Sequence, residues 1–334
     1  MDFRPDETQQ AITDLARAVT AAEGTEWAAL GQAGLLTLAV PEKLGGAGLG
    51  ILETAFVLTE IGRRALDVPA LSHLAAGVPL VARWGSERQR EELLVGPVLG
   101  LAVAEPGDPL PAAPRTALAT DGTVSGVKTG VIPGDRILVT VDGPGVVVVD
   151  PAAAGVHLDD PAGGGRVLRL DRVVAEPLGA LEDGPLVHAD LHRNAIAGAC
   201  ALGDGALAGA LALTADHVRE REQFGRPIAT FQAVAQQVAD VYVTARTLHL
   251  VALSAAWRLG TGRDADEELD VAALWFTAEA PAAARTCHHL HGGLGLSIDY
   301  PLHRHTALIR DLVRFLGGGE HRLTVLGDRL CTSN

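Results

Sequence analysis

The sequence predicts a mainly α-helical protein with a small central β domain, because its character changes twice along the chain. Up to about residue 99, apolar residues recur at the three- and four-residue spacing of helices. From about 100 to 183, glycine and proline separate short β-branched runs, which favours strands joined by tight turns. Long helical patterns then return. We therefore expect an N-terminal helical domain at 1–99, a middle β domain at 100–183 and a C-terminal helical bundle at 184–334.

Helices are expected in the N-terminal third wherever the apolar spacing persists. Ile12, Leu15 and Val19 follow helical spacing in the first helix, and Ser86 is a suitable N-cap for the last one. The expected helices span residues 6–22, 51–64, 70–84 and 87–94.

A glycine-rich segment at residues 40–50 lies between the early helices. A dinucleotide-binding glycine loop follows a strand and has an acidic residue further on. The spacing here differs from that pattern. We therefore expect a connecting loop.

Local sequence patterns also predict strands in the middle segment and helices in the C-terminal segment. The β-branched runs at 136–141 and 146–149 are expected to be strands. After residue 232, apolar residues alternate spacings of four and three, which predicts a long helix with one buried face. That face comprises Val234, Val238, Val241, Ala245 and Leu248. Residues 267–287 predict another helix, which Pro281 should bend or restart.

The composition argues against several classes of function. With 334 residues the chain is long enough for two or three domains. Its net charge of −14 repels phosphate backbones, so we expect no nucleic-acid partner. No apolar run is expected to reach the length of a membrane span, and the N-terminus lacks a signal-peptide pattern. The three cysteines are far apart, which implies no disulfide framework and fits a reducing cytoplasm.

The segment from Arg219 to Gln232, which we call the elbow, connects two long helical patterns. Gly225 is a plausible stop for the helix before it, and Thr230 a plausible N-cap for the next. We expect a helix–turn–helix connection. Its arginines, amide, aromatic ring and free N–H groups suit an anionic ligand that carries a ring. The alternative is an ordinary connection with solvated charges.

The elbow resembles the Arg-x-Gln-Phe-Gly-x-Pro-Ile-x-x-Phe-Gln signature of acyl-CoA dehydrogenases, which runs here from Arg221 to Gln232. In that family the segment crosses a dimer interface and holds the pyrophosphate and adenosine of an FAD bound largely by the neighbouring subunit. The resemblance implies FAD as cofactor, in contact with Arg221, Gln223, Phe224 and Gln232. It also implies the family fold, in which a helical domain, a β domain and an oligomer-forming four-helix bundle follow one another.

A second motif, His288-His-Leu-His-Gly-Gly-Leu-Gly295, has two interpretations from chemistry alone. A metal site would usually need acidic or cysteine ligands as well, which are missing nearby. A helix C-terminus would place the histidines near its last carbonyls. The motif is similar to the family's Gln-x-x-Gly-Gly-x-Gly, which packs glycine backbone against FAD. On that match Gly292 and Gly293 contact FAD, and His289 replaces the glutamine.

The catalytic base of the family has no clear counterpart. The resemblance implies α,β-desaturation of an acyl-CoA thioester, in which a carboxylate removes a proton from Cα and a hydride passes from Cβ to the flavin. Most members have the base where this chain has Leu316, and Glu320 lies about one helical turn further on. Other members place it where this chain has His192–Ile196, which contains no carboxylate. Asp190 and Asp204 flank that stretch, so they and Glu320 are only weak candidates.

Two further stretches, which we call the flavin-ring segments, depart from the family pattern. The resemblance aligns Ala104–Pro109 with a Thr-Glu-Pro-x-x-Gly-Ser segment, of which only Glu-Pro-Gly remains. It aligns Lys128–Val131 with a Trp-Ile-Thr segment whose tryptophan is missing here. In the family these segments hold the isoalloxazine ring. Without an aromatic wall and hydroxyl donors they are poorly suited to do so.

The retained residues belong to the half of the FAD site that a subunit contributes to its neighbour. The changed residues belong to the half that a subunit uses for its own FAD. We therefore expect a heteromeric enzyme in which a second acyl-CoA dehydrogenase subunit supplies the base and holds the flavin ring.

A closer resemblance has the same implication. The opening Met1-Asp-Phe3, the second motif and the ending Leu316–Leu323 look like the small subunit of actinobacterial steroid side-chain acyl-CoA dehydrogenases. Those enzymes are α2β2 tetramers of cholesterol catabolism. The resemblance implies a steroid CoA thioester as substrate, and the family's usual electron acceptor is an electron-transfer flavoprotein. Two alternatives stay open: a self-sufficient homo-oligomeric dehydrogenase, and a catalytically silent scaffold subunit.

Overall fold

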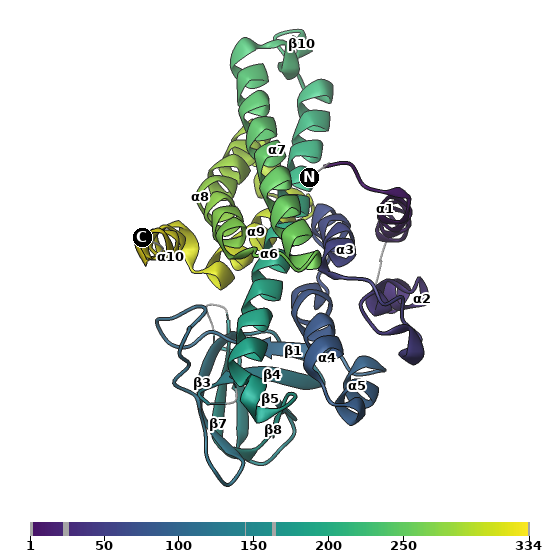
Figure 1. The fold of residues 1–334 in the computed structure, drawn as a ribbon. Coiled ribbons are helices and arrows are strands. Elements are labelled where there is room, and N and C mark those ends of the chain that lie inside the picture. Colours follow the sequence, from purple (N-terminus) through teal and green to yellow (C-terminus); the bar gives the residue numbers. More distant parts are fainter. Residues whose placement is uncertain (1–2, 23–26, 144, 162–164, 333–334) are drawn as a thin grey trace. The chain divides into compact units, whose positions relative to one another are not determined.

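The structure is a computed structural model that describes residues 3–22, 27–143, 145–161 and 165–332 (Figure 1). Met1 and Asp2 of the opening motif lie outside the described residues. Contacts divide the chain into two compact units, which are described one at a time. Unit 1 contains the described parts of 1–26, 55–67 and 199–334, and unit 2 contains those of 27–54 and 68–198. The division into three domains stays a prediction.

The helical elements that lie wholly within unit 2 are short. These are α2 (Trp27–Gln32), the 3₁₀ turns η1 (Leu35–Thr37) and η2 (Glu42–Leu44), the π-helix η3 (Leu71–Gly77), α4 (Val78–Trp84), α5 (Glu87–Leu94) and the 3₁₀ turn η4 (Leu181–Asp183). Ser86 caps α5 as predicted, because its hydroxyl accepts from the backbone N–H of Gln89 while the Gln89 side chain accepts from that of Ser86. The connecting loop predicted at 40–50 is confirmed, since a 3₁₀ turn rather than a strand precedes it.

Two four-stranded sheets supply the core of unit 2 (Figure 1). One has the order β1-β4-β5-β8, with β1 parallel to β4, and the other is the antiparallel sheet β2-β3-β7-β6. The strands are β1 (Leu99–Ala102), β2 (Ala117–Leu118), β3 (Thr123–Val131), β4 (Arg136–Val141), β5 (Gly145–Val149), β6 (Val156–Asp159), β7 (Arg166–Val174) and β8 (Glu176–Pro177). The strands predicted at 136–141 and 146–149 are confirmed as β4 and β5. Valines of both sheets, including Val139 and Val173, share one fully buried cluster.

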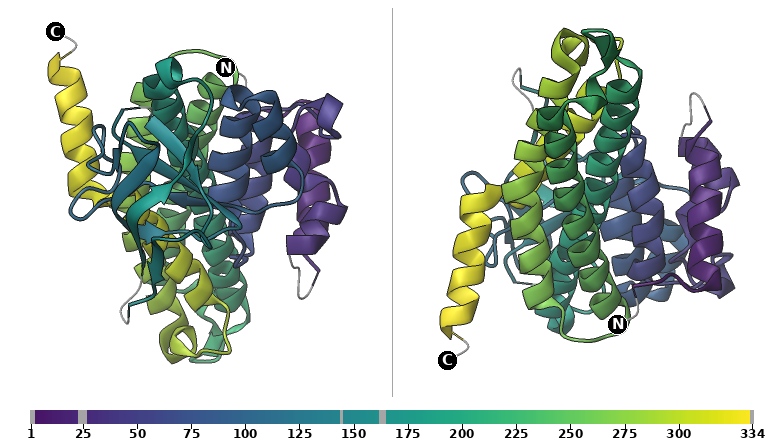
Figure 2. Two further views of the ribbon diagram at one scale, coloured as in Figure 1. Left: turned by 90° about the horizontal axis from the view of Figure 1, so that it is seen from below. Right: turned by 90° about the horizontal axis from the view of Figure 1, so that it is seen from above.

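Unit 1 is helical. It contains α1 (Glu7–Thr20), α7 (Gln232–Gly260), α8 (Asp266–His291), α9 (Leu302–Leu316) and α10 (Gly318–Thr332), and α3 (Ile51–Arg63) and α6 (Gly184–Glu220) contribute residues to both units. Both views of Figure 2 show α10 projecting away from the other C-terminal helices. An ion pair of 2.6 Å between Arg329 Nε and Asp270 Oδ2 attaches it to α8. The predicted class, mainly α with a small central β region, is confirmed.

The helix predicted at 6–22 is confirmed as α1. The residues that α1 buries are Ile12, Ala16 and Thr20, which follow a spacing of four, whereas Leu15 is 43% exposed. The buried face therefore includes an alanine and a threonine, which apolar spacing alone does not reveal.

Two details of the bundle helices also differ. In α7 the stripe is fully buried only from Val241 onward, while Val234 and Val238 remain partly exposed. The helix α8 continues through Pro281 without restarting. Alanines on both sides of that proline are buried, so tertiary packing outweighs its local preference.

The expectation about membrane-length apolar runs is wrong for one segment. Leu181–Glu220, which is α6 with the turn before it, is long and apolar enough to cross a membrane, with a mean hydropathy of 1.6. Inside the protein 78% of its most apolar stretch is buried, as expected of a core helix.

Candidate functional site

The elbow folds as a β-hairpin, not as the direct helix–turn–helix connection that the sequence predicts. The helix α6 ends at Glu220, and β9 (Glu222–Gln223) pairs with β10 (Arg226–Pro227) at the end of the α6–α7 pair (Figure 1). Phe224 and Gly225 form the turn with φ of 54° and 78°. Two successive residues with positive φ are typical of tight hairpin turns, so Gly225 serves the turn instead of ending the helix.

Thr230 is not the N-cap of the next helix. Its hydroxyl donates to the Pro227 carbonyl inside the 3₁₀ turn η5 (Ile228–Thr230), and Phe231 precedes α7 without a side-chain cap. Gln232 is the first residue of α7 and is exposed. The first N–H groups of α7 consequently have no side-chain cap at the elbow.

The elbow presents side chains that its own chain leaves unpaired. Phe224 is 93% exposed, and its ring meets Phe231 edge-on at 6.2 Å. The Arg226 guanidinium lies over the Phe231 ring at 4.3 Å. Among the described residues, the side chains of Arg221 and Gln223 have no hydrogen-bond or ion-pair partner. A cation, an amide and an aromatic ring are therefore available to a ligand.

The second motif ends α8 and opens a turn. Gly292 caps the helix with φ 57° and ψ −138°, and its N–H donates to the carbonyls of His288 and His289. A Cβ added at Gly292 or Gly293 would meet no atom within 4 Å. A ligand can therefore approach the protein backbone closely at these two glycines. His289 is exposed. No group of three or more His, Cys, Asp or Glu side chains is placed to hold a metal ion in the described chain.

His291 links this turn to the elbow. Its ring stacks on that of His217, with centroids 4.5 Å apart, and its Nε2 lies 3.0 Å from the hydroxyl of Tyr300. His217 is in the last turn of α6, and its carbonyl accepts from the N–H of Arg221. Sequence reasoning missed His217 and Tyr300. The available signal was the position of His217, one helical turn before the first elbow residue of the FAD signature.

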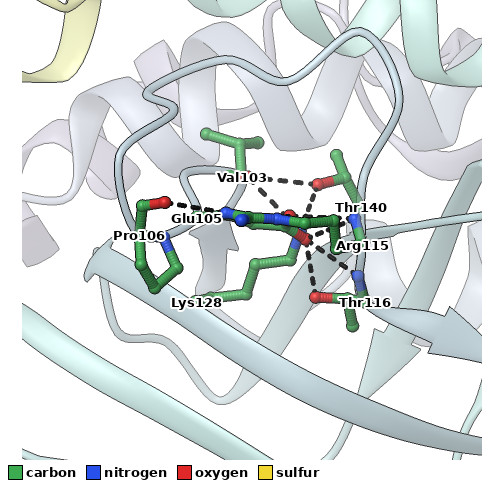
Figure 3. Close-up of polar contacts among 7 residues, drawn as sticks. All are labelled: Val103, Glu105, Pro106, Arg115, Thr116, Lys128 and Thr140. Atoms are coloured by element: carbon green, nitrogen blue, oxygen red, sulfur yellow. Dashed lines mark hydrogen bonds and ion pairs between the residues drawn. The ribbon is translucent and has the colours of Figure 1, made fainter.

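The flavin-ring segments are held by a buried ion pair (Figure 3). Lys128 is fully buried, and its Nζ donates to Glu105 Oε1 and to the Thr140 hydroxyl, each at 2.8 Å. Glu105 also accepts from the backbone N–H groups of Arg115 and Thr116. The carboxylate and the ammonium thus satisfy each other inside unit 2.

The titration of this pair follows from its surroundings. Burial raises the pKa of Glu105, but the hydrogen bonds from Lys128 and from the Arg115 and Thr116 amides outweigh it and lower that pKa to about 2. Burial lowers the pKa of Lys128 to about 8, although Glu105 partly compensates. Both groups are charged at neutral pH and neither is free to act on a substrate.

No aromatic side chain stands in either flavin-ring segment. Gly130 is in the second segment, and a Cβ added there would meet no atom within 4 Å. A flat flavin ring would lack its usual aromatic support.

The weak candidates for the base are engaged or exposed. Asp190 Oδ2 accepts from the Trp84 indole at 2.8 Å and pairs with Arg83 at 3.1 Å. Asp204 lies 2.8 Å from His249 Nδ1 and lines a cavity of about 190 Å³ in unit 1. Glu320 is exposed at the start of α10. Asp204 also lines a second, larger cavity of about 730 Å³ in unit 1, between residues of α6 and α7. Asp190 and Asp204 are thus already hydrogen-bonded, and Glu320 lines neither of these cavities.

Close helix packing fills the region beside the stretch His192–Ile196. A Cβ added at Gly198 of α6 would lie 2.1 Å from the Cβ of Ala75 in the π-helix η3. Every residue of η3 is buried. The two helices touch at backbone distance there, so no ligand chain fits between them at that point.

Comparison with known proteins identifies the family. A family model described as "Acyl-CoA dehydrogenase, N-terminal domain" matches residues 5–100, and one described as "Acyl-CoA dehydrogenase, C-terminal domain" matches 188–330. The chain belongs to the acyl-CoA dehydrogenase family. Members of this family are FAD-dependent oxidoreductases.

Three individual proteins are similar to nearly the whole chain. The chain of this dehydrogenase is 43% identical to the acyl-CoA dehydrogenase FadE28 of Mycobacterium tuberculosis, over 98% of this chain and 99% of FadE28. Its fold matches a chain of the ChsE4–ChsE5 complex of the same organism, with a TM-score of 0.85, 30% identity and 99% coverage of both chains. It also matches the Tcur3481–Tcur3483 steroid ACAD, with a TM-score of 0.87, 30% identity and 98% coverage of both.

The residues of this dehydrogenase fit FAD unequally. The unpaired Arg221 and Gln223, the exposed Phe224 ring and the open glycine turn suit the phosphates and adenosine of FAD. The flavin-ring segments offer a buried ion pair and no aromatic wall. Among the described residues, the elbow and the glycine turn thus fit FAD better than the flavin-ring segments do.

Proposed function

We propose that this chain is the FAD-sharing subunit of a heteromeric, α2β2 acyl-CoA dehydrogenase that introduces an α,β double bond into an acyl-CoA thioester. A partner acyl-CoA dehydrogenase subunit supplies the catalytic base and holds the flavin ring. This chain completes the FAD site across the interface through Arg221, Gln223, Phe224, Gln232, His289 and the Gly292–Gly293 backbone.

The observation that carries this proposal is the contrast between the two halves. The elbow exposes the Phe224 ring, and its Arg221 and Gln223 side chains have no polar partner in the described parts of the chain. The candidate acids are paired, as Asp190 and Asp204 are, or exposed, as Glu320 is. A subunit that only helps to bind its neighbour's FAD needs the exposed elbow side chains but needs no catalytic acid of its own.

Bound FAD supplies the hydride acceptor for the desaturation. The residues of this chain act on binding and orientation. Arg221 is placed to form charge-assisted hydrogen bonds with phosphate oxygens, and the exposed Phe224 ring to cover the adenosine part. The glycine turn allows close backbone approach.

The substrate class rests on the relatives. The Tcur3481–Tcur3483 protein is a steroid ACAD, and ChsE4–ChsE5 is a complex of two proteins. In each of these two structures the matched chain is 30% identical to this chain. They support a steroid CoA thioester as substrate and a second subunit as partner. An electron-transfer flavoprotein as acceptor and a cytoplasmic location complete the proposal.

Replacing Arg221 by alanine in the complex with the partner subunit tests the proposal. We expect FAD to dissociate about tenfold more readily, because a charge-assisted phosphate contact is lost. Equilibrium ultrafiltration of FAD from the purified complex measures the change. Arg219→Ala is the matched control, since Arg219 already pairs with Asp216 at 3.0 Å on the same helix. A scaffold that does not contact FAD would hold it equally well in both variants, and that result would contradict the proposal.

A further inference from the structure

The two segments assigned to FAD are joined through one imidazole stack. His217 comes from the last turn of α6, which leads into the elbow, and His291 is the last residue of α8, which leads into the glycine turn. Their rings are 4.5 Å apart and inclined by only 18°. Each ring therefore limits the movement of the helix end that carries the other.

The hydrogen bonds of His291 fix the tautomer of its neutral ring. Its Nδ1 lies 2.8 Å from the Cys287 carbonyl, which can only accept, so Nδ1 carries the proton. In the neutral ring, Nε2 then accepts from the Tyr300 hydroxyl at 3.0 Å. Both nitrogens are used, and the ring is only 5% exposed. The orientation of the residue that precedes Gly292 is thus set from three directions.

We propose that His217, His291 and Tyr300 are positioning residues that hold the elbow and the glycine turn in register, so that both contact FAD as one unit. The proposal rests on the FAD-sharing function. It assigns to these side chains a role in FAD affinity although none of them needs to touch FAD.

The stack also makes FAD binding sensitive to acid. Burial, the neighbouring His291 and Arg221 lower the pKa of His217, which favours its neutral ring at neutral pH. Protonation of His217 in acid would place a cation against the neighbouring His291 ring and weaken the stack. Burial and the two acids on α6 raise the pKa of Tyr300, which keeps its hydroxyl protonated. The ionisable groups around the stack are Asp216 and Glu220 on α6, Arg221 directly after it, His288 on α8 and His303 on α9.

The test uses the complex of this chain with its partner subunit and measures the FAD dissociation constant at pH 7.5 and 5.5. We expect His217→Ala to weaken FAD binding about fivefold at pH 7.5, because the stack is lost. His217→Phe keeps an aromatic ring in place and should bind FAD within about twofold of the wild type. It should also lose much of the weakening that the wild type shows at pH 5.5. Tyr300→Phe should weaken binding about threefold, since one hydrogen bond is removed.

The controls separate this inference from the function beneath it. His157→Ala removes an exposed histidine of β6 and should change neither affinity nor pH dependence. If Arg221→Ala loosens FAD while His217→Ala and Tyr300→Phe do not, the positioning role is wrong and the shared site stands. If Arg221→Ala has no effect either, the FAD-sharing function itself is wrong. Thermal melting of each variant complex shows whether a loss of affinity reflects unfolding, and His217→Phe, which keeps the ring, preserves the pH test in that case.

Discussion

Lys128 has a structural role in this chain, because its charged group is used entirely within the core. It stands in a flavin-ring segment, yet its ammonium is fully buried and donates to Glu105 and Thr140 (Figure 3). A buried charge persists only when a partner compensates its desolvation. The pair therefore connects the loop after β1 to β3 and β4 within the core of unit 2.

Replacing Lys128 by methionine should destabilise the protein by about 3 kcal/mol, because the buried Glu105 would keep only the exposed Arg115 as a countercharge. Urea unfolding of the variant measures the loss. The double variant Lys128→Met with Glu105→Gln should recover part of it, since neither charge is then buried alone. A Lys128→Met protein as stable as the wild type would show that the ion pair does not stabilise unit 2.

Histidines show what single residues in a sequence can and cannot reveal. The second motif predicts a helix end with histidines near its last carbonyls, and His291 does bond to the Cys287 carbonyl. The sequence does not show that His217, 74 positions before His291, stacks on it. Such contacts depend on how α6 and α8 pack, which local patterns do not specify.

At the scale of elements, the predictions succeed where the cause is local. The capping box at Ser86 and the β-branched strands β4 and β5 follow from residues a few positions apart. The motif locates the elbow but does not reveal its hairpin, because Phe224 takes a positive φ that an aromatic residue seldom adopts. The predicted cap at Thr230 is wrong because Thr230 belongs to η5, which precedes α7.

The contact of α6 with the π-helix η3 gives an element-scale prediction. Gly198→Ala should destabilise the protein by about 2 kcal/mol, because the new Cβ would lie 2.1 Å from that of Ala75 and neither methyl group can rotate away. Gly327→Ala in α10 is the matched control. There the new Cβ meets no atom within 4 Å, so helix propensity alone should stabilise the variant slightly. Equal midpoints of thermal unfolding for Gly198→Ala and the wild type would mean that the helices are not in backbone contact.

At the scale of the whole molecule, the family and the fold class follow from sequence motifs, while the incomplete site needs the structure. The missing tryptophan and base are visible as departures from a signature. Only the structure shows that Asp190 is held by Trp84 and Arg83, that Glu320 is exposed, and that the side chains of Arg221 and Gln223 have no polar partner among the described residues. These features support the proposal that the chain shares its partner's FAD.

Counting flavin in the purified chain, alone and together with its partner subunit, tests this claim most directly. Both samples pass through gel filtration in FAD-free buffer, and the retained FAD is measured by absorbance against protein. The account predicts that the lone chain loses its FAD and has no acyl-CoA dehydrogenase activity, whereas the complex retains FAD and desaturates the thioester. A lone chain that keeps one FAD per polypeptide and oxidises an acyl-CoA would contradict it.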